Sequence, residues 1–200
     1  MLLYVLIGIN LAVSFWGFKE FQAGRGRRFL FMPAEAARGR NLEGAVLSQF
    51  SHADLGHLFF NMLTLWFFGP VVERALGIHV LTVYFGAGFA ALLAVFLLRL
   101  RDPAYRVLGA SGAVTGILFA AIVLEPGMRI SLLILPIPAP APVFALVYLA
   151  ASTFFMSRGD MTNVSHEAHV GGALAGLALG GLLAPEGFRP LLDSVRGLVG

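Results

Sequence analysis

Residues 109–116, Gly-Ala-Ser-Gly-Ala-Val-Thr-Gly, place one serine among small residues at the start of an apolar run of helical length. Ser111 therefore begins a predicted helix, where the backbone N–H groups of the first turn have no partner within the helix. The helix dipole favours negative charge at this end, so an oxyanion formed at the serine would meet these donors. Taken alone, the stretch is also typical of a serine that caps a helix and of glycines that pack helices together.

A second stretch, residues 166–176 (HEAHVGGALAG), places His169 at the head of another apolar, glycine-rich run. Glycines four apart occur in both runs: Gly112 and Gly116 after the serine, and Gly172, Gly176 and Gly180 after the histidine. Such glycines share one helix face and allow close helix–helix approach, so we expect Ser111 and His169 to come within hydrogen-bond distance. An ionisable residue facing lipid is costly, which favours a nucleophile and base over a histidine that merely caps a loop at the interface.

The composition indicates a multi-pass membrane protein. The chain has 200 residues, of which 58% are hydrophobic and 12% charged, whereas a soluble domain carries about 25% charged residues. The formal net charge of +3 comes mostly from arginines in connecting segments, which suits contact with lipid headgroups. No basic stripe interleaves with aromatic residues, which argues against nucleic-acid binding. The chain has no cysteine, which excludes disulfides, a cysteine nucleophile and thiolate metal sites.

Six apolar segments approach the roughly 20 residues that a transmembrane helix needs: Leu2–Phe18, His57–Val72, His79–Arg99, Ser111–Leu124, Val143–Met156 and His169–Ala184. The first lacks the basic start of a signal peptide, so we expect it to remain as a transmembrane helix. Residues 129–135 are expected to extend a helix or to lie at the interface, and the prolines at 136, 138, 140 and 142 prevent a continuous helix there. With no repeat or second domain in view, residues 1–200 are expected to form a single membrane domain.

Two polar residues head the second segment. His57 and Asn61 are four apart and so share a helix face; donors from this face would complete an oxyanion site with the Ser111 N–H. Asn61 is equally compatible with a role in holding helices together, and Asp54 is expected to cap this helix. Glu167 lies two residues before His169 and would face away from it, so we expect a Ser–His dyad without an orienting carboxylate.

These motifs together resemble the rhomboid family of intramembrane serine proteases. The resemblance rests on His57-x-x-x-Asn61, Gly109-x-Ser111-Gly112, Ala168-His169-x-x-Gly172-x-x-x-Gly176 and Glu73-Arg74 followed by Gly77, and it covers nearly the whole chain. It implies an all-α membrane protein with a six-transmembrane-helix rhomboid-like bundle. It also implies Ser111 as nucleophile, His169 as general base, and His57 and Asn61 as oxyanion donors, with no metal or cofactor.

The resemblance further implies that the substrates are transmembrane proteins in the lipid bilayer; it predicts no particular oligomeric state. The family usually has an aromatic residue one turn after the serine, beneath the base. Here that position is Thr115, and we expect Phe119 to replace the aromatic in part.

For the location we expect a plasma (inner) membrane, with the active site facing the extracytoplasmic side as in the family. The distribution of arginines favours the opposite orientation, because the first, third and fifth connections carry most of them. The long first connection dips into the membrane in the family, where its arginines would contact headgroups, so the resemblance is preferred.

Four other functions are compatible with parts of the sequence. A soluble α/β-hydrolase is excluded because Ala113 stands where its Gly-x-Ser-x-Gly elbow needs glycine. A metalloprotease is disfavoured because His166 and His169 are one residue too close for His-Glu-x-x-His. A channel or transporter is disfavoured because no apolar segment carries a charge relay. A catalytically inactive rhomboid-like protein that binds membrane clients remains the main alternative.

Overall fold

The computed structural model describes residues 2–131, 137–158 and 165–199. Its helices are α1 (Leu2–Gln22), α2 (Pro33–Ala36), α3 (Glu43–Leu47), α4 (Leu55–Leu76), α5 (His79–Arg99), α6 (Ser111–Leu124), α7 (Ala141–Arg158), α8 (His166–Leu183) and α9 (Arg189–Val199), with short 3₁₀ helices η1 (Gly26–Phe29) and η2 (Ser48–Phe50). The strands β1 (Arg129–Ile130) and β2 (Ala139–Pro140) pair antiparallel, with Arg129 opposite Pro140. Of the predicted helix extension at 129–135, residues 132–135 lie outside the described part of the chain, as does Pro136.

All six predicted apolar segments are helices, with ends that differ by a few residues. The helix that contains His57 begins at Leu55, because Asp54 caps it as predicted: the Asp54 carboxylate accepts the His57 backbone N–H at 2.8 Å. It continues through Pro70 and ends before Gly77, whose φ of 57° favours glycine. The helix that contains His169 begins three residues earlier than predicted, because the Ser165 hydroxyl accepts the Ala168 N–H at 3.3 Å.

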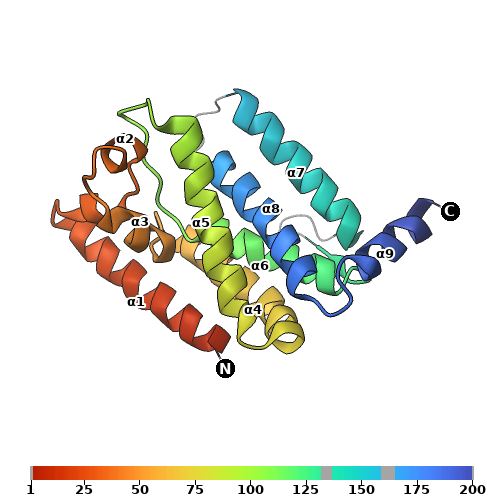
Figure 1. Ribbon diagram of the computed structural model, residues 1–200. Helices are drawn as coiled ribbons and strands as arrows, with labels where there is room; N and C mark the ends of the chain where they lie inside the picture. Colours follow the sequence, from red (N-terminus) through yellow and green to blue (C-terminus); the bar gives the residue numbers. More distant parts are fainter. Residues whose placement is uncertain (1, 132–136, 159–164, 200) are drawn as a thin grey trace.

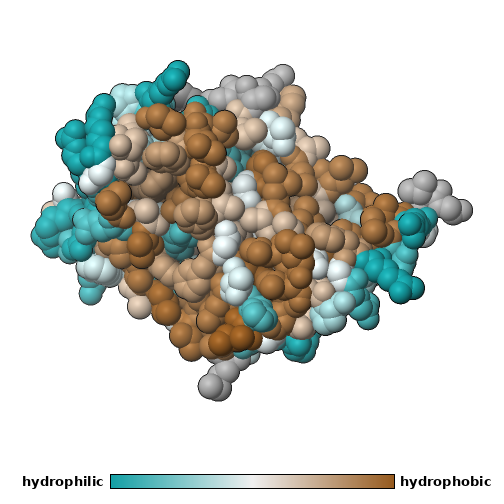
Figure 2. Space-filling model, in the orientation of Figure 1, coloured by the Kyte–Doolittle hydropathy of each residue, from teal (hydrophilic) through white to brown (hydrophobic). Residues whose placement is uncertain are grey.

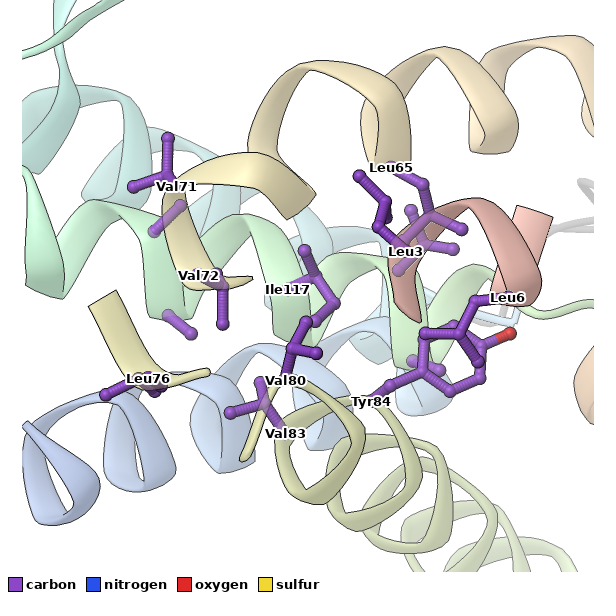
Figure 3. Close-up of a cluster of buried hydrophobic side chains, with 14 of the residues drawn as sticks. Leu3, Leu6, Leu65, Val71, Val72, Leu76, Val80, Val83, Tyr84 and Ile117 are labelled. Carbon is purple, nitrogen blue, oxygen red and sulfur yellow. The ribbon is translucent and has the colours of Figure 1, made fainter. Parts of the chain in front are cut away.

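The centre of the bundle is α6, and every residue of this helix from Gly112 to Val123 is buried. It packs against α4, α5 and α8, while α1 lies at one side of the bundle and α7 at the other (Figure 1). Apolar side chains from α1, α4, α5 and α6 fill the space between these helices, as Figure 3 shows for Leu3, Leu65, Val80 and Ile117. The helix that begins with the serine is therefore held from several directions.

The predicted glycine contact between α6 and α8 is confirmed. A Cβ added at Gly172 would overlap the backbone oxygen of Gly112, and one added at Gly176 would overlap the backbone oxygen of Gly116. The two backbones touch over a full helical turn, which requires residues without side chains at this face. This contact brings the first turns of α6 and α8 together.

The outer surface of the bundle is apolar, as a membrane protein requires. Large apolar side chains such as Phe67, Phe89 and Leu146 are exposed, and Figure 2 shows hydrophobic residues over the middle of the molecule. The helices α1, α4 and α5 are each long and apolar enough to cross a membrane, and α6 and the Ala141–Met156 part of α7 are shorter apolar helices. The fold is an all-α membrane bundle.

Two parts of the fold were not predicted from the sequence. The connection between α1 and α4 folds into η1, α2, α3 and η2. Its arginines form ion pairs: Arg25 with Glu20, Arg27 with Glu35, and Arg28 with Glu43. A backbone bridge between Phe31 and Val107 ties this connection to the segment before α6. The helix α9 follows the sixth apolar helix and carries polar residues on one side, which lie at the edge of the molecule in Figure 2.

Candidate active site

The structure brings Ser111 and His169 together. Nε2 of His169 lies 2.8 Å from Oγ of Ser111, although the two residues are 58 positions apart. Ser111 is the first residue of α6 and His169 lies in the first turns of α8, so the glycine contact between these helices sets the distance. Hydrogen bonding to an imidazole is the arrangement that activates a serine hydroxyl as a nucleophile.

The serine is not the cap of its helix. The residue at the N-cap of α6 is Ala110, which makes no side-chain capping bond. The hydroxyl of Ser111 is directed to the imidazole instead, and the backbone N–H groups of this first turn have no acceptor within the helix. Of the two interpretations of this stretch, the geometry agrees with a serine–histidine pair.

His57 lies next to the serine, on the other side of Gly109. A Cβ added at Gly109 would be 2.7 Å from Cε1 of His57 and 3.5 Å from Oγ of Ser111. The φ of Gly109 is 151°, which side chains rarely tolerate, so both space and backbone conformation require glycine here. The structure thus places the ring of His57 and the hydroxyl of Ser111 against the same glycine, and the oxyanion role of His57 stays a prediction.

Asn61 is tied to its own helix. Its side-chain N–H donates to the backbone oxygen of His57 at 3.0 Å, and the residue is buried. Both predicted oxyanion residues therefore lie on one face of α4, but the hydrogen bond found for Asn61 runs to His57 and leaves only its second amide proton for another acceptor.

His52 is a buried neighbour whose contacts the sequence did not reveal. Its Nδ1 lies 2.8 Å from the hydroxyl of Ser14 in α1, and its ring meets the ring of His57 edge-on at 5.1 Å. Burial, with a smaller contribution from the nearby His57, lowers the pKa of His52 to about 3. A neutral His52 therefore joins α1 to the ring that lies beside Ser111.

Glu167 faces away from the site, as predicted. Its carboxylate accepts from Nε of Arg99 in α5 at 2.6 Å and from the hydroxyl of Tyr105 at 3.0 Å. The bond from Arg99 to Glu167 joins the head of α8 to α5, and it does not involve His169. The candidate site is a Ser–His dyad in which no hydrogen bond joins Glu167 to the imidazole.

The ring that packs against His169 is Tyr148 of α7, which sequence reasoning missed. The two ring centroids are 6.4 Å apart and their planes are tilted by 32°. Phe119, the residue expected to replace the missing aromatic, packs edge-on against Tyr148 at 5.4 Å, and Thr115 lies within 3.3 Å of the Tyr148 hydroxyl. A tyrosine in an apolar helix gives no sequence signal of this contact, because the contact depends on how α7 lies against α8.

The described residues contain no group of three or more histidine, aspartate or glutamate side chains that could hold a metal ion. The groups that the structure brings together at this site are the serine hydroxyl, the imidazole and the backbone N–H groups at the start of α6. These are the groups of a covalent acyl-transfer reaction.

A family model for the rhomboid domain matches residues 40–186, a range that contains Ser111, His169, His57 and Asn61. The chain belongs to the rhomboid family. The family that the sequence motifs predicted is therefore confirmed.

Several relatives are similar over most of this rhomboid chain. It is 32% identical over 187 residues to Rhomboid protein 1, mitochondrial, of Saccharomyces cerevisiae. The aligned region covers 90% of this chain and 52% of that protein. It is 33% identical over 176 residues to the presenilin-associated rhomboid-like protein, mitochondrial, of Homo sapiens, where the aligned region covers 86% of this chain and 45% of that protein. It is 32% identical over 148 residues to RHOMBOID-like protein 12, mitochondrial, of Arabidopsis thaliana, where the aligned region covers 66% of this chain and 44% of that protein. The chain spans about half the length of these relatives.

The expected location in a plasma (inner) membrane is wrong. The names of all three relatives place those proteins in mitochondria, as does that of the related protein from Bos taurus. The extracytoplasmic orientation was defined for a plasma membrane and is withdrawn with it. The prediction failed because apolar helices fit any bilayer, and neither the composition nor the motifs distinguish one membrane from another.

Proposed function

We propose that this rhomboid chain is an intramembrane serine endopeptidase that cleaves transmembrane segments of other proteins with a Ser111–His169 dyad. The observation that carries the proposal is the 2.8 Å contact between the Ser111 hydroxyl and Nε2 of His169. A hydroxyl and an imidazole inside an apolar bundle are costly to bury unless they are paired. Their pairing at the head of a helix also supplies backbone donors beside the serine.

In the acylation step the Ser111 hydroxyl attacks the scissile carbonyl carbon while Nε2 of His169 takes its proton. The tetrahedral oxyanion receives hydrogen bonds from the backbone N–H groups at the start of α6, from His57 and from the second amide proton of Asn61. The carbon–nitrogen bond then breaks, and His169 returns its proton to the leaving amine. This leaves the amino-terminal part of the substrate as an ester on Ser111.

In the deacylation step a water molecule attacks the ester while His169 removes its proton. The carbon–oxygen bond to Ser111 breaks, the serine regains its proton from His169, and the carboxylic acid product is released. Neither step uses the carboxylate of Glu167, which is bound to Arg99 and Tyr105, so packing around the imidazole is proposed to orient it.

The proposal extends to the whole chain and its surroundings. We propose that residues 1–200 form a single domain with six membrane spans in a mitochondrial membrane, and that its partners are transmembrane substrates and the lipid bilayer. The apolar surface of the bundle and the mitochondrial names of the relatives support this.

Cleavage by purified protein in liposomes tests the proposal. The substrate is a single transmembrane helix with glycine and proline near one end, and the proteins are the wild type, Ser111→Ala, His169→Ala and the double variant. We expect each single variant to lose cleavage and the double variant to lose no more, because the two residues act as one unit. Ser131→Ala, at an exposed serine, is the matched control and should cleave like the wild type.

Substantial cleavage by Ser111→Ala would contradict the serine mechanism. Binding of the substrate by the wild type without any cleavage dependent on Ser111 would instead identify a catalytically inactive, client-binding member of the family.

A further inference from the structure

We propose that Tyr148 of α7 is the positioning residue of the catalytic base, and that Thr115 of α6 holds Tyr148 in place through its hydroxyl. This inference rests on the proposed function, because it assigns a residue to the orientation of His169 in that reaction. In Figure 1, α7 runs beside α8, and the two helices are in contact. Tyr148 thus reaches the base from a helix that carries neither the nucleophile nor the base.

The ring of Tyr148 contacts the imidazole and two phenylalanines. It contacts the His169 ring at 6.4 Å and 32°, Phe119 edge-on at 5.4 Å, and Phe144 at 6.1 Å and 32°. Phe119 is fully buried in α6. The phenylalanines limit the space into which the tyrosine ring can move, so the ring forms a fixed wall against one side of the imidazole.

The hydroxyl of Tyr148 is anchored to the helix that carries the nucleophile. It lies 3.3 Å from Oγ1 of Thr115, a buried residue four positions after Ser111 and hence on the same face of α6. Ser152, one turn further along α7 on the same helix face, is also buried. The contact from Thr115 to Tyr148 to His169 therefore links α6, α7 and α8 around the dyad.

The dyad needs such a link because, among the residues that the structure describes, no hydrogen bond joins its base to a carboxylate. The acid nearest in sequence, Glu167, is bound to Arg99 and Tyr105. The other ring found near His169 is His166, which meets it edge-on at 6.4 Å. Rotation of the imidazole away from Ser111 is thus opposed by ring packing, and a displacement of about 1 Å at a reacting group can cost about 10²-fold in rate.

The first test separates kcat from KM for Tyr148→Leu, Tyr148→Phe and Thr115→Val in the cleavage assay. Tyr148→Leu removes the ring and should lower kcat about 10- to 100-fold while KM changes little, because the substrate does not bind to this ring. Tyr148→Phe keeps the ring and should lower kcat less than Tyr148→Leu does. Leu146→Ala, at an exposed position of the same helix, is the control and should match the wild type.

The hydroxyl contact is tested by a double variant. Tyr148→Phe and Thr115→Val each remove one partner and should cost at most about 10-fold, the size of one neutral hydrogen bond. Because both variants break the same contact, the double variant should be no slower than the slower single one. Additive losses would overturn the pairing, and an unchanged kcat in Tyr148→Leu would overturn the positioning role.

The second test does not depend on proteolysis. The NMR signals of the His169 ring, in protein labelled with ¹³C-histidine, should shift in Tyr148→Leu and stay in place in Leu146→Ala, because an adjacent aromatic ring shields the imidazole. Unshifted His169 signals in Tyr148→Leu would overturn the inference even if the protein cleaves substrate. Shifted signals in a protein that shows no cleavage would instead support the contact and contradict the proposed function.

Discussion

At the scale of single residues, Gly109 decides which side chain can reach the serine. Because Gly109 has no Cβ, the ring of His57 can lie against it, on a residue that also borders the Ser111 hydroxyl. We predict that His57→Ala lowers kcat about 10²- to 10³-fold, the size measured for one oxyanion donor, with a much smaller effect on KM. A donor used mainly in the transition state acts on turnover and leaves ground-state binding nearly unchanged. Unchanged turnover, measured with the same substrate, would show that His57 points elsewhere during the reaction.

His52 gives a pH dependence to the stability of the fold. Its pKa is about 3 in the folded protein, chiefly because it is buried, and 6.5 when exposed. Between these values the unfolded state binds more protons than the folded state, so stability falls as the pH decreases from 6.5 towards 3. We predict that acidification from pH 7 to pH 4 lowers the melting temperature of the wild type in detergent more than that of His52→Gln.

The control for this prediction is His79→Gln. His79 is exposed at the head of α5, so its replacement should leave the pH dependence of the wild type unchanged. Parallel melting curves for the wild type and His52→Gln at both pH values would mean that His52 is not the group that titrates.

The residues of the candidate site differ in how far the sequence predicts them. Ser111 and His169 follow from two apolar runs with the same glycine spacing, because that spacing specifies which helix faces meet. Tyr148 has no comparable pattern around it, and its partners on other elements come from two helices, α6 and α8. Its role depends on the tertiary placement of α7, which local sequence does not encode.

At the scale of helices, the contact between α6 and α8 is the feature that positions the dyad. We predict that Gly172→Ala destabilises the bundle by about 1–3 kcal/mol, the usual cost of overpacking, because the added Cβ would overlap the backbone of Gly112. It should also reduce cleavage, since separating the helices lengthens the contact between Ser111 and His169. Equilibrium unfolding in detergent, together with the cleavage rate, measures both effects.

The matched control is Gly8→Ala in α1, where an added Cβ would meet nothing within 4 Å. This variant should unfold like the wild type or slightly later, because alanine favours a helix more than glycine does. Equal destabilisation by the two substitutions would show that the glycine contact does not hold α6 and α8 together.

The sequence predicts these elements unevenly. Long apolar runs revealed six helices, because burial in lipid makes nearly the whole segment apolar. The helix α9 was missed because it is short and alternates apolar residues with Arg189, Asp193 and Arg196. The short helices of the first connection were missed because ion pairs and the bridge between Phe31 and Val107 hold them, and these contacts join distant residues.

At the scale of the whole molecule, the site lies within an apolar bundle and its substrate would arrive as a helix. A helical peptide bond is shielded by its own turn, and lipid offers no partners for freed backbone groups. We therefore predict that a substrate helix is cut where glycine or proline already weakens it. Replacing those residues by leucine, downstream of the cut in one cleaved substrate, should slow cleavage strongly.

The rate of product formation in liposomes measures this effect, with leucine substitutions at the far end of the same substrate helix as the control. Equally fast cleavage through the stable, leucine-substituted helix would contradict the need for local unwinding.

The central claim is that Ser111 is a nucleophile activated by His169, and covalent labelling measures this most directly. Purified protein is treated with a mechanism-based serine reagent, and the modified residue is located by mass spectrometry. We predict a single adduct on Ser111 that is absent in Ser111→Ala, formed much more slowly in His169→Ala, and unaffected by a chelator of divalent metals. An adduct on another residue, equally fast labelling without His169, or loss of labelling with the chelator and its recovery with zinc would contradict the account.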